Sequence, residues 1–422
     1  MQTNRLAVTL DAPLAVSQAR DTSNRYALPP AVPPTTLRGA LAAVAEKGAA
    51  TGAEETPSMD ELFGPRGCRT SALLPSDPGM LGEVAPTPLT QRTCKRHGGL
   101  REEGGHGIED ILFDALLFAL RDNAEGLRAL RLCRTEDCSQ VLTGMSGALG
   151  AASDASFFRP PEPSTRTQAH VGLDRRRQGA ASGILYSREV ISEKTGTAGG
   201  DLVPTRMQAD VTGTEEMMEF LRSVLQGATL HVGTARSRGL GTCQVQAFEE
   251  VAPSTMMPAP PPLEQRINQF NERWGEWCEK RGESPGGPIV SLTLQTPALF
   301  VDDFLRPTLA PDGASMLQAA YDEERPAASA LEGLEKAHQI ARPTQVQSWN
   351  GMAEFPHRSA QGLAPGSVLV FRAEDLDEPL YNALGHVEEA GIGLRRHFGF
   401  GRVRVCSPIH THLHEHLADA HA

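Results

Sequence analysis

The chain has 422 residues, a formal net charge of −12 and 40% hydrophobic residues. That length exceeds one ordinary core, so we expect two domains. It contains no apolar run of about 18 residues and no apolar signal core at its start, so we expect a cytoplasmic protein with no membrane partner. Seven cysteines scattered over so long a chain argue against a disulfide framework and for reduced thiols or a metal site.

The net negative charge disfavours nucleic-acid binding over the whole surface, because phosphate contacts need cations. The basic residues are nevertheless concentrated. Residues 166–188 contain five arginines against one acid, and residues 395–404 contain four arginines and no acid. An RNA could follow such tracks while the rest of the surface stays acidic. Aromatic residues make up only 5% of the chain, so backbone contacts rather than extensive base stacking would dominate.

The first elements in the chain are a strand and a helix. Alternating apolar residues at 6–10 predict the strand. After a proline-rich stretch, TTLRGALAAVAEKG offers Thr35 and Thr36 as N-caps, and Gly48 ends the helix. Arg38 stands in the first turn of this helix. Helix N-termini attract anions, so Arg38 is either part of an anion site or an ordinary surface arginine.

The next stretch, about residues 86–140, has the composition of a loop-rich insertion around an amphipathic helix at 111–122. Strands at 170–173 and 184–191 then flank an arginine-rich loop. A helix at 215–227 and strands near 229–233 and 243–248 complete this half.

Prolines dominate residues 253–263 and predict an extended linker. The second half predicts a helix at 263–281, a strand at 289–300, helix within 313–339, a strand at 366–371 and a last helix before a closing strand. Each half thus predicts strand, helix, irregular strands, helix, glycine-rich loop and strand. This order indicates an α+β protein of two ferredoxin-like domains, in the form known as RRM-like. The expected domains are 1–252, which holds the insertion, and 264–406, followed by a His-rich tail at 407–422.

A glycine-rich loop precedes the last strand of each half, at residues 236–245 (RSRGLGTCQV) and 395–405 (RRHFGFGRVRV). Glycine adopts positive φ readily, and amide and guanidinium groups both donate to phosphate oxygens. One such loop is commonly just a tight turn, but two related copies predict a phosphate chain lying across both domains. Phe398 and Phe400 stand among the glycines of the second copy, and we expect them to pack inward rather than stack on a base.

The insertion carries cysteine and histidine residues at chelating spacings, C-x-x-H and C-x-x-x-x-C. Three thiolates and one imidazole complete a tetrahedral zinc shell, and a metal would stabilise an insertion that has few large apolar residues. The expected ligands are Cys94, His97, Cys133 and Cys138. His106 or Cys68 are alternatives to His97, and unpaired buried thiols are the alternative to a metal.

The order of these motifs resembles the RAMP superfamily of CRISPR-associated proteins, in particular the large RAMP subunit of type III-D systems (the Csx-ten family, related to the Cas-five group). The stretches that carry the resemblance span nearly the whole chain: TTLRGAL, LFGPRGCRTSALLP, RTQAHVGLDRRRQGAASGILYSREV, RSRGLG, SWNGMAEFPHRSAQGLAPGSVLVF and GIGLRRHFGFGRV. The resemblance implies a non-catalytic subunit of a type III effector complex that acts in antiviral defence. Such a subunit holds the 5′ repeat-derived tag of the CRISPR RNA (crRNA). It contacts the large polymerase-like subunit and the backbone RAMP subunits, and meets target RNA through the complex.

The resemblance also implies which residues line the RNA path. The glycine loops would hold the tag, and the arginine-rich loop would lie near the guide or a neighbouring subunit. With the helix-start arginine, the expected RNA-binding residues are Arg38, Arg175, Arg176, Arg177, Arg236, Arg238, Gly239, Gly241, Arg395, Arg396, Gly399 and Gly401.

Two other functions stay open from the residues alone. A metal-independent endoribonuclease that processes CRISPR RNA could use His170, His231 or His357 as general acid or base, and Asp174 could serve as a base or a metal ligand. A purely architectural subunit would turn its arginines toward protein carboxylates. The chain has no paired-carboxylate cluster and no nucleotide-binding fingerprint, so we expect no catalysis, and we expect Asp174 to pair with its arginine neighbours.

The tail places histidines at alternate positions: His410, His412, His414 and His416. On a strand they would share one face and could bind a metal adventitiously. We expect instead a solvated, mobile end.

Overall fold

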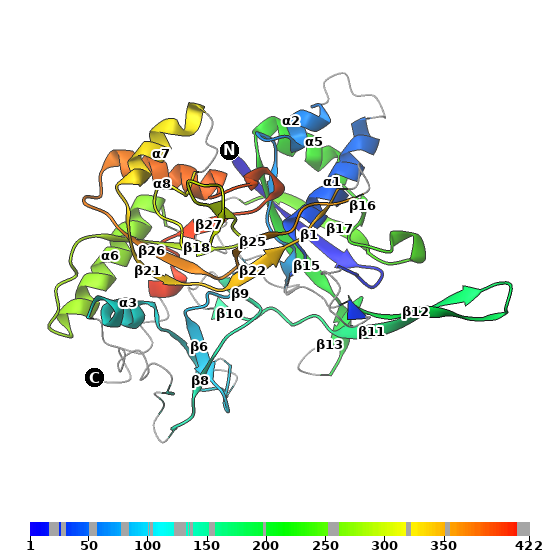
Figure 1. Ribbon diagram of the computed structural model, residues 1–422, viewed down its shortest axis with the longest axis horizontal. Helices are drawn as coiled ribbons and strands as arrows, with labels where there is room; N and C mark the ends of the chain where they lie inside the picture. Colours follow the sequence, from blue (N-terminus) through cyan, green and yellow to red (C-terminus); the bar gives the residue numbers. More distant parts are fainter. Residues whose placement is uncertain are drawn as a thin grey trace.

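The computed structural model describes most of the chain, in a mixed α and β arrangement (Figure 1). The described residues are 1–16, 25–26, 31–49, 57–76, 84–99, 101, 104–121, 132–133, 135, 138–151, 157–196, 200–251, 261–317, 322–350 and 355–411. Among them, no helix is both long and apolar enough to span a bilayer.

The first of two main sheets comes from the N-terminal half, in the order β16-β17-β1-β15-β3, with β4 also paired to β15. Its strands are β1 (Gln2–Leu10), β3 (Arg69–Thr70), β4 (Leu74–Pro75), β15 (Arg206–Gly213), β16 (Thr229–His231) and β17 (Thr242–Glu250). In β1, Leu6, Val8 and Leu10 alternate with less buried residues. This period of two aims one face of the sheet at a core shared with α1 (Pro34–Ala49), α2 (Met59–Phe63) and α5 (Glu215–Leu225).

The second main sheet has the order β21-β26-β18-β27. Its strands are β18 (Ile289–Leu294), β21 (Glu335–Ile340), β26 (Val368–Arg372) and β27 (Val403–Val405), and its helices are α6 (Leu263–Glu279), α7 (Arg325–Glu332) and α8 (Glu378–Ala390). All six residues of β18 are buried, which suits a central strand covered on both faces. Phe270 and Trp274 of α6 fill the core beside it.

Both sheets follow the same β-α-β-β-α-β connectivity, as the repeat in the sequence predicts. In the first, β1 leads through α1 to the edge strands β3 and β4, then to β15 and through α5 to β17. In the second, β18 leads through α7 to β21, then to β26 and through α8 to β27. The helix predicted within 313–339 is confined to α7. Residues 335–340 form β21 instead, because they pair with the exposed edge of β26.

Within the described residues, the region of the predicted insertion forms two small sheets and one helix. The sheets have the orders β7-β6-β8 and β10-β9-β5. The elements are β5 (Val84–Pro86), β6 (Gln91–Cys94), β7 (Ile108–Asp110), α3 (Leu112–Leu120), β8 (Leu142–Gly144), β9 (Ala148–Ala151) and β10 (Phe157–Phe158). Helix α3 packs in the core of the second sheet: Phe113 lies 5.1 Å from Phe270 between ring centroids. The predicted linker at 253–263 falls largely on residues 252–260, which lie outside the described residues.

A long hairpin, β11 (Thr165–Asp174) and β12 (Gly179–Ile191), extends away from the body as an arm (Figure 1). We call it the arginine hairpin, with its tip at residues 175–178. β2 (Arg25–Tyr26) pairs with β12 near the base. The remaining elements are β13 (Lys194–Gly196), β14 (Leu202–Pro204), β19 (Phe300–Val301), β20 (Pro307–Thr308), β22 (Pro343–Val346), β23 (Trp349–Asn350), β24 (Phe355–Pro356), β25 (Ala360–Leu363) and the short 3-10 turns η2 (Arg236–Arg238), η3 (Asp322–Glu324) and η4 (Arg396–Phe398).

Candidate functional site

The first glycine loop (residues 235–241) and the second glycine loop (residues 395–401) have the same backbone conformation. Each begins with a left-handed residue: Ala235 has φ 58° and Arg395 has φ 59°. Each continues through a 3-10 turn, η2 or η4, to a left-handed glycine. The repeat in the sequence is therefore a repeat in structure.

The last glycine of each loop makes the same contacts. The Gly241 amide donates to the Pro13 carbonyl, and the Gly401 amide donates to the Pro297 carbonyl, both at 2.8 Å. A Cβ at Gly241 would lie 1.9 Å from the Val232 carbonyl oxygen, and one at Gly401 would lie equally close to a carbonyl. These glycines are required by the close approach of another backbone segment. The requirements of folding alone thus explain why the two loops have the same shape.

The first loop leaves its arginines at the surface. Arg236 and Arg238 are both exposed, while Leu240 is buried and packs with Val190 of β12. The Arg238 Nη1 donates to the Tyr186 hydroxyl, also on β12, at 2.6 Å. This contact joins the first glycine loop to the arginine hairpin.

The hairpin tip carries three exposed arginines, Arg175, Arg176 and Arg177. The Asp174 carboxylate accepts from the backbone amides of Arg176 and Arg177 at 2.9 and 3.2 Å, and its second oxygen lies 3.7 Å from the Arg177 Nε. Asp174 therefore shapes the turn and pairs with its neighbour, as we expect from the sequence. The tip presents its charge to solvent.

The second loop is packed into the protein. Arg396 is 8% exposed and forms a two-point ion pair with Glu324, with Nη–Oε distances of 2.7 and 3.3 Å. Phe400 is 2% exposed, and Phe398 lies under the Arg38 guanidinium at 5.1 Å, so both aromatics pack inward as expected. The buried Arg396 and both aromatic rings of the second loop thus make internal contacts.

The second loop also seats against the first half of the chain. A Cβ at Gly399 would lie 2.3 Å from the carbonyl oxygen of Thr70 and 2.6 Å from the Cβ of Pro34. Arg38, which the sequence offers as part of an anion site, donates to the Phe63 carbonyl. This hydrogen bond engages its guanidinium group within the protein. Burial first, and then the charges of Arg38 and other nearby arginines, lower the pKa of His397. This junction is rich in cations that are largely enclosed.

The expected RNA-binding residues thus fall into two groups. Those exposed at one end of the molecule are Arg175, Arg176, Arg177, Arg236, Arg238 and Gly239; those held in the interior or at the junction are Arg38, Gly241, Arg395, Arg396, Gly399 and Gly401. Arg395 is only partly buried. Sequence reasoning did not single out Tyr186 and Arg188, two half-buried residues of β12; Tyr186 contacts the exposed group through its hydrogen bond with Arg238. No spacing in the sequence relates them to Arg238, about fifty residues away.

The histidines proposed as general acids or bases lie apart. His170 stacks on Tyr186 with ring centroids 5.0 Å apart, His231 is exposed on β16, and His357 lies 5.7 Å from the Phe398 ring. Burial, followed by the charges of Arg188 and Arg238, lowers the pKa of His170.

A sealed polar network joins the insertion to the end of the chain. His410 is fully buried and bonds Asp110 Oδ2 through Nδ1 at 2.7 Å and Thr293 Oγ1 through Nε2 at 2.8 Å. Hydroxyl, imidazole and carboxylate stand in the order of a hydrolase triad. Burial of all three groups denies access to a substrate, so the network holds structure together. His410 therefore departs from the expected mobile tail, while residues 412–422 lie outside the described residues.

The thiol cluster consists of Cys94, His106, Cys133 and Cys138, whose ligand atoms all lie within 4.8 Å of one another. The structure places His106 here rather than His97. The His97 ring is exposed and stacks on His106 at 4.5 Å, while its amide faces the Cys94 sulfur at 3.5 Å. Cys68 lies in the core of the first sheet.

The spacing within the thiol cluster suits one tetrahedral ion. Cys94 and Cys138 sulfurs are 3.8 Å apart, and the Cys133 sulfur is 3.4 Å from the His106 Nδ1. Ligands about 2.3 Å (sulfur) and 2.0 Å (nitrogen) from a tetrahedral zinc would lie about 3.8 and 3.5 Å apart, respectively. The cluster could hold a metal.

The other cysteines are chemically different. Burial raises the pKa of the Cys68, Cys243 and Cys406 thiols to about 12 and that of Cys278 to about 11. Burial would also raise the pKa of Cys94, but hydrogen bonds from the backbone amides of His97 and Arg96 and from neighbouring thiols hold it below its ordinary value. At Cys138 a hydrogen bond with the Gln140 backbone lowers the pKa, but burial and the neighbouring Cys133 and Cys94 thiols outweigh it, so the pKa is raised. Metal ions bind the thiolate, so of these two thiols Cys94 ionises more readily for this purpose.

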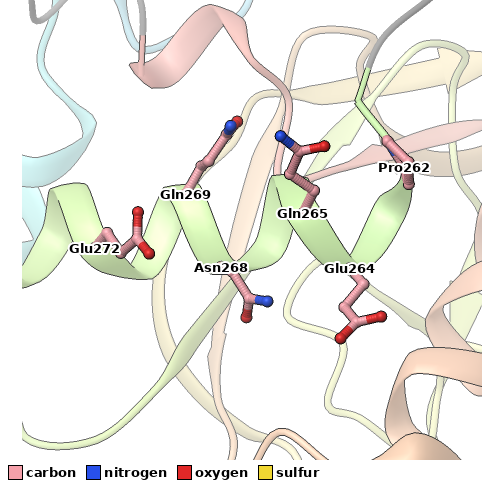
Figure 2. A pocket seen from close by; sticks show the side chains of 6 residues that line it. All are labelled: Pro262, Glu264, Gln265, Asn268, Gln269 and Glu272. Atoms are coloured by element: carbon pink, nitrogen blue, oxygen red, sulfur yellow. The ribbon is translucent and has the colours of Figure 1, made fainter.

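A shallow hollow of about 520 Å³ runs along the outer side of α6. Figure 2 shows that its lining side chains all come from this one helix and the residue that precedes it: Pro262, Glu264, Gln265, Asn268, Gln269 and Glu272. Its charged groups are carboxylates, which repel phosphate. This is the solvent face of an amphipathic helix rather than an RNA site.

Comparison with known proteins gives only distant similarity. No protein-family model and no curated protein matches the chain. Among solved structures, a chain of Type III-B Cmr-beta bound to cognate target RNA is similar over 94% of this chain and 96% of that chain, at 8% identity and a TM-score of 0.42. A CRISPR associated protein Cas6 is similar over 96% and 98% (9% identity, TM-score 0.34), and Thermus thermophilus Cas6 over 80% and 98% (12% identity, TM-score 0.29). These scores are low, so the function proposed below rests on this chain's own residues.

Proposed function

We propose that the chain is a non-catalytic, RNA-binding RAMP subunit with two ferredoxin-like domains. It belongs in a type III, III-D-like CRISPR effector complex, where it holds the 5′ repeat-derived tag of the crRNA. The order of sequence motifs supports the family, and the repeated sheet connectivity agrees with it. The observation that carries RNA binding is the hydrogen bond from Arg238 to Tyr186, which places the exposed first glycine loop against the arginine hairpin.

The exposed arginines form a track from the loop to the hairpin tip. Arg236 and Arg238 lie at the base and Arg175–Arg177 at the tip, so a flexible phosphate backbone would meet guanidinium groups at both ends of the arm. The net charge of −12 keeps the remaining surface repulsive to RNA. This division favours one defined path over general adhesion.

The second loop takes a different part in this function. It holds the first half of the chain against the second through Phe398, which lies under Arg38, and Gly399, which lies against Thr70 and Pro34, while Arg396 anchors the loop within the second half through Glu324. We assign it to positioning the RNA path rather than to direct phosphate contact.

Contacts with neighbouring subunits fit the same arm. Val171, Leu173 and Leu185 of the hairpin are 51%, 74% and 63% exposed. Large apolar side chains so exposed on a projecting element favour burial against a partner, here the large polymerase-like subunit or a backbone RAMP subunit. Target RNA would be met through the assembled complex.

We assign zinc to the thiol cluster, as a structural ion that closes the insertion. Three sulfurs and one nitrogen at tetrahedral spacing are a donor set typical of structural zinc. Cys94 at the end of β6 and Cys138 before β8 would then be fixed together, which stabilises a region with few apolar contacts of its own.

Metal analysis of the purified full chain tests this assignment. About one zinc per chain is expected, and Cys133→Ser should lose it, whereas Cys243→Ala, which removes a buried thiol outside the cluster, should keep it. A metal-free wild-type chain with unchanged thermal stability after chelation contradicts the assignment.

Salt-dependent binding of repeat-tag RNA by the full chain tests the RNA-binding role. Affinity should fall as salt rises, with a log–log slope of about 0.7 per phosphate contact on a single strand. Replacing Arg175, Arg176 and Arg177 by glutamate should weaken binding, while Arg222→Glu on α5 should not. Unchanged RNA retention in all variants would favour the architectural role instead, and specific cleavage by the wild type would favour the endoribonuclease.

A further inference from the structure

Four side chains of complementary chemistry lie at the corner between the first glycine loop and the arginine hairpin: two aromatic rings and two guanidinium groups. On β12, Val190, Arg188 and Tyr186 stand at alternate positions and so share one face of the strand. Val190 is buried against Leu240 and Ala235 of the first loop, which shows that this face is turned toward the loop. Arg238 reaches from the loop to the Tyr186 hydroxyl.

The aromatic part of this corner is a stacked pair. His170 is directly opposite Tyr186 in the strand pairing, and their rings are 5.0 Å apart at an interplanar angle of 18°. The His170 Nε2 is buried and has no hydrogen-bond partner among the described residues. A buried polar atom without a partner is costly, so it points to a group that completes the site.

The charged part of the corner is positive. Arg188 shares its face of β12 with Tyr186, the ring that stacks on His170, and Arg238 hydrogen-bonds the Tyr186 hydroxyl, so both arginines belong to the surroundings of the imidazole. Burial, followed by the charges of these two arginines, lowers the pKa of His170. Two guanidinium groups beside a neutral imidazole and a phenol hydroxyl suit a phosphodiester, and the stacked rings suit a nucleobase.

We propose that His170, Tyr186, Arg188 and Arg238 form an anchoring subsite for one nucleotide of single-stranded RNA. The phosphate lies against the two arginines, and the base stacks on the His170–Tyr186 pair. The subsite deepens the proposed function, on which it rests, by giving one nucleotide a fixed place where the hairpin leaves the body. The other phosphates are held by the exposed arginines farther out, at the hairpin tip.

The experiment uses the full chain and a repeat-tag RNA that carries 2-aminopurine at one position at a time. Stacking should quench the fluorescence at one position, and Tyr186→Leu should remove the quenching there and weaken binding roughly 10-fold. Tyr186→Phe keeps the ring and should retain the quenching. Arg238→Ala should weaken binding and lower the salt slope by about 0.7, because it removes a phosphate contact. Arg222→Ala is the matched control, an exposed arginine on α5 in the same half of the chain.

The outcomes separate this subsite from the proposed function. If the wild type binds the RNA but Tyr186→Leu, His170→Ala and Arg238→Ala all bind and quench as it does, the subsite is wrong and the function stands. If the wild type itself shows no salt-dependent binding, the proposed function fails. If the RNA is cut at the quenched position and His170→Ala abolishes the cut, the corner is catalytic and the anchoring role is overturned. Arg238 is exposed, so Arg238→Ala keeps the test valid should a hairpin variant fail to fold.

Discussion

The first and second glycine loops share a backbone and differ in everything that surrounds it. Arg236 and Arg396 occupy equivalent positions, yet Arg236 is exposed and Arg396 is paired with buried Glu324. Arg238 reaches the arginine hairpin, whereas its equivalent, Phe398, packs under Arg38. The comparison teaches that a repeated motif can repeat its fold without repeating its function. The glycines define the turn, and the residues just before them decide what the turn does.

The largest expected difference concerns stability. Arg396→Ala leaves Glu324 buried without its main partner, which should cost about 3 kcal/mol, whereas Arg236→Ala should cost less than about 0.5 kcal/mol. Urea unfolding of the two variants measures both changes. Equal losses in the free energy of unfolding would mean that the two arginines contribute equally to stability, and would contradict this difference.

The second difference concerns the middle glycines. Gly239 and Gly399 both have positive φ, but a Cβ at Gly239 meets nothing within 4 Å, whereas one at Gly399 meets Thr70 and Pro34. Gly239→Ala should therefore cost about 1 kcal/mol from backbone strain alone, and Gly399→Ala about 3 kcal/mol because the junction must also shift. Thermal unfolding of both variants, with Gly227→Ala as an open, positive-φ control, checks the prediction. If Gly399→Ala were as stable as Gly239→Ala, the predicted effect of crowding at the junction would be wrong.

The third difference concerns RNA. The double change Arg236→Glu and Arg238→Glu should weaken repeat-tag RNA binding at least roughly 10-fold at moderate salt, because two charge-assisted contacts become repulsive. Arg395→Glu, in the second loop, should change binding much less. Fluorescence anisotropy at several salt concentrations measures both. A larger effect from Arg395→Glu would move the RNA path to the junction.

The smallest expected difference is a pH effect. Burial and the arginines around it lower the pKa of His397 in the folded protein, whereas the first loop has Ser237 at the equivalent position. The unfolded chain then binds the proton more readily than the folded chain. Stability should therefore be full above about pH 6.5 and decline as the pH falls below it. His397→Gln should flatten this decline in thermal midpoints measured from pH 7.5 to 5.5, and an unchanged profile would contradict the assignment.

Much of the architecture could be predicted from the sequence. Alternation in β1, the alanine-rich helix α1 and the amphipathic α5 each carry a local period that burial then confirms. Strand β21 could not be predicted in this way, because its sequence favours helix about as well as strand and its state is decided by pairing with β26.

The site was predictable where its residues are neighbours in sequence. Cys133 and Cys138 stand at a chelating spacing, and the structure brings Cys94 to them as expected. The histidine could not be chosen, because His97 and His106 lie on two sides of one loop and only the fold decides which ring faces the sulfurs. Tyr186 and Arg188 gave no signal, since their role depends on Arg238 reaching across from a distant loop.

Helix α3 has a consequence for how this protein is made. Its buried residues Leu112, Phe113 and Leu116 belong to the core that α6 and β18 complete, although α3 precedes them by some 150 residues. During synthesis the apolar face of α3 therefore stays exposed on the nascent chain until those elements have been made. Cutting the chain at its proline-rich segment should therefore separate α3 from the core that it helps to fill, which leaves an uncovered apolar helix on one fragment and a gap in the core of the other.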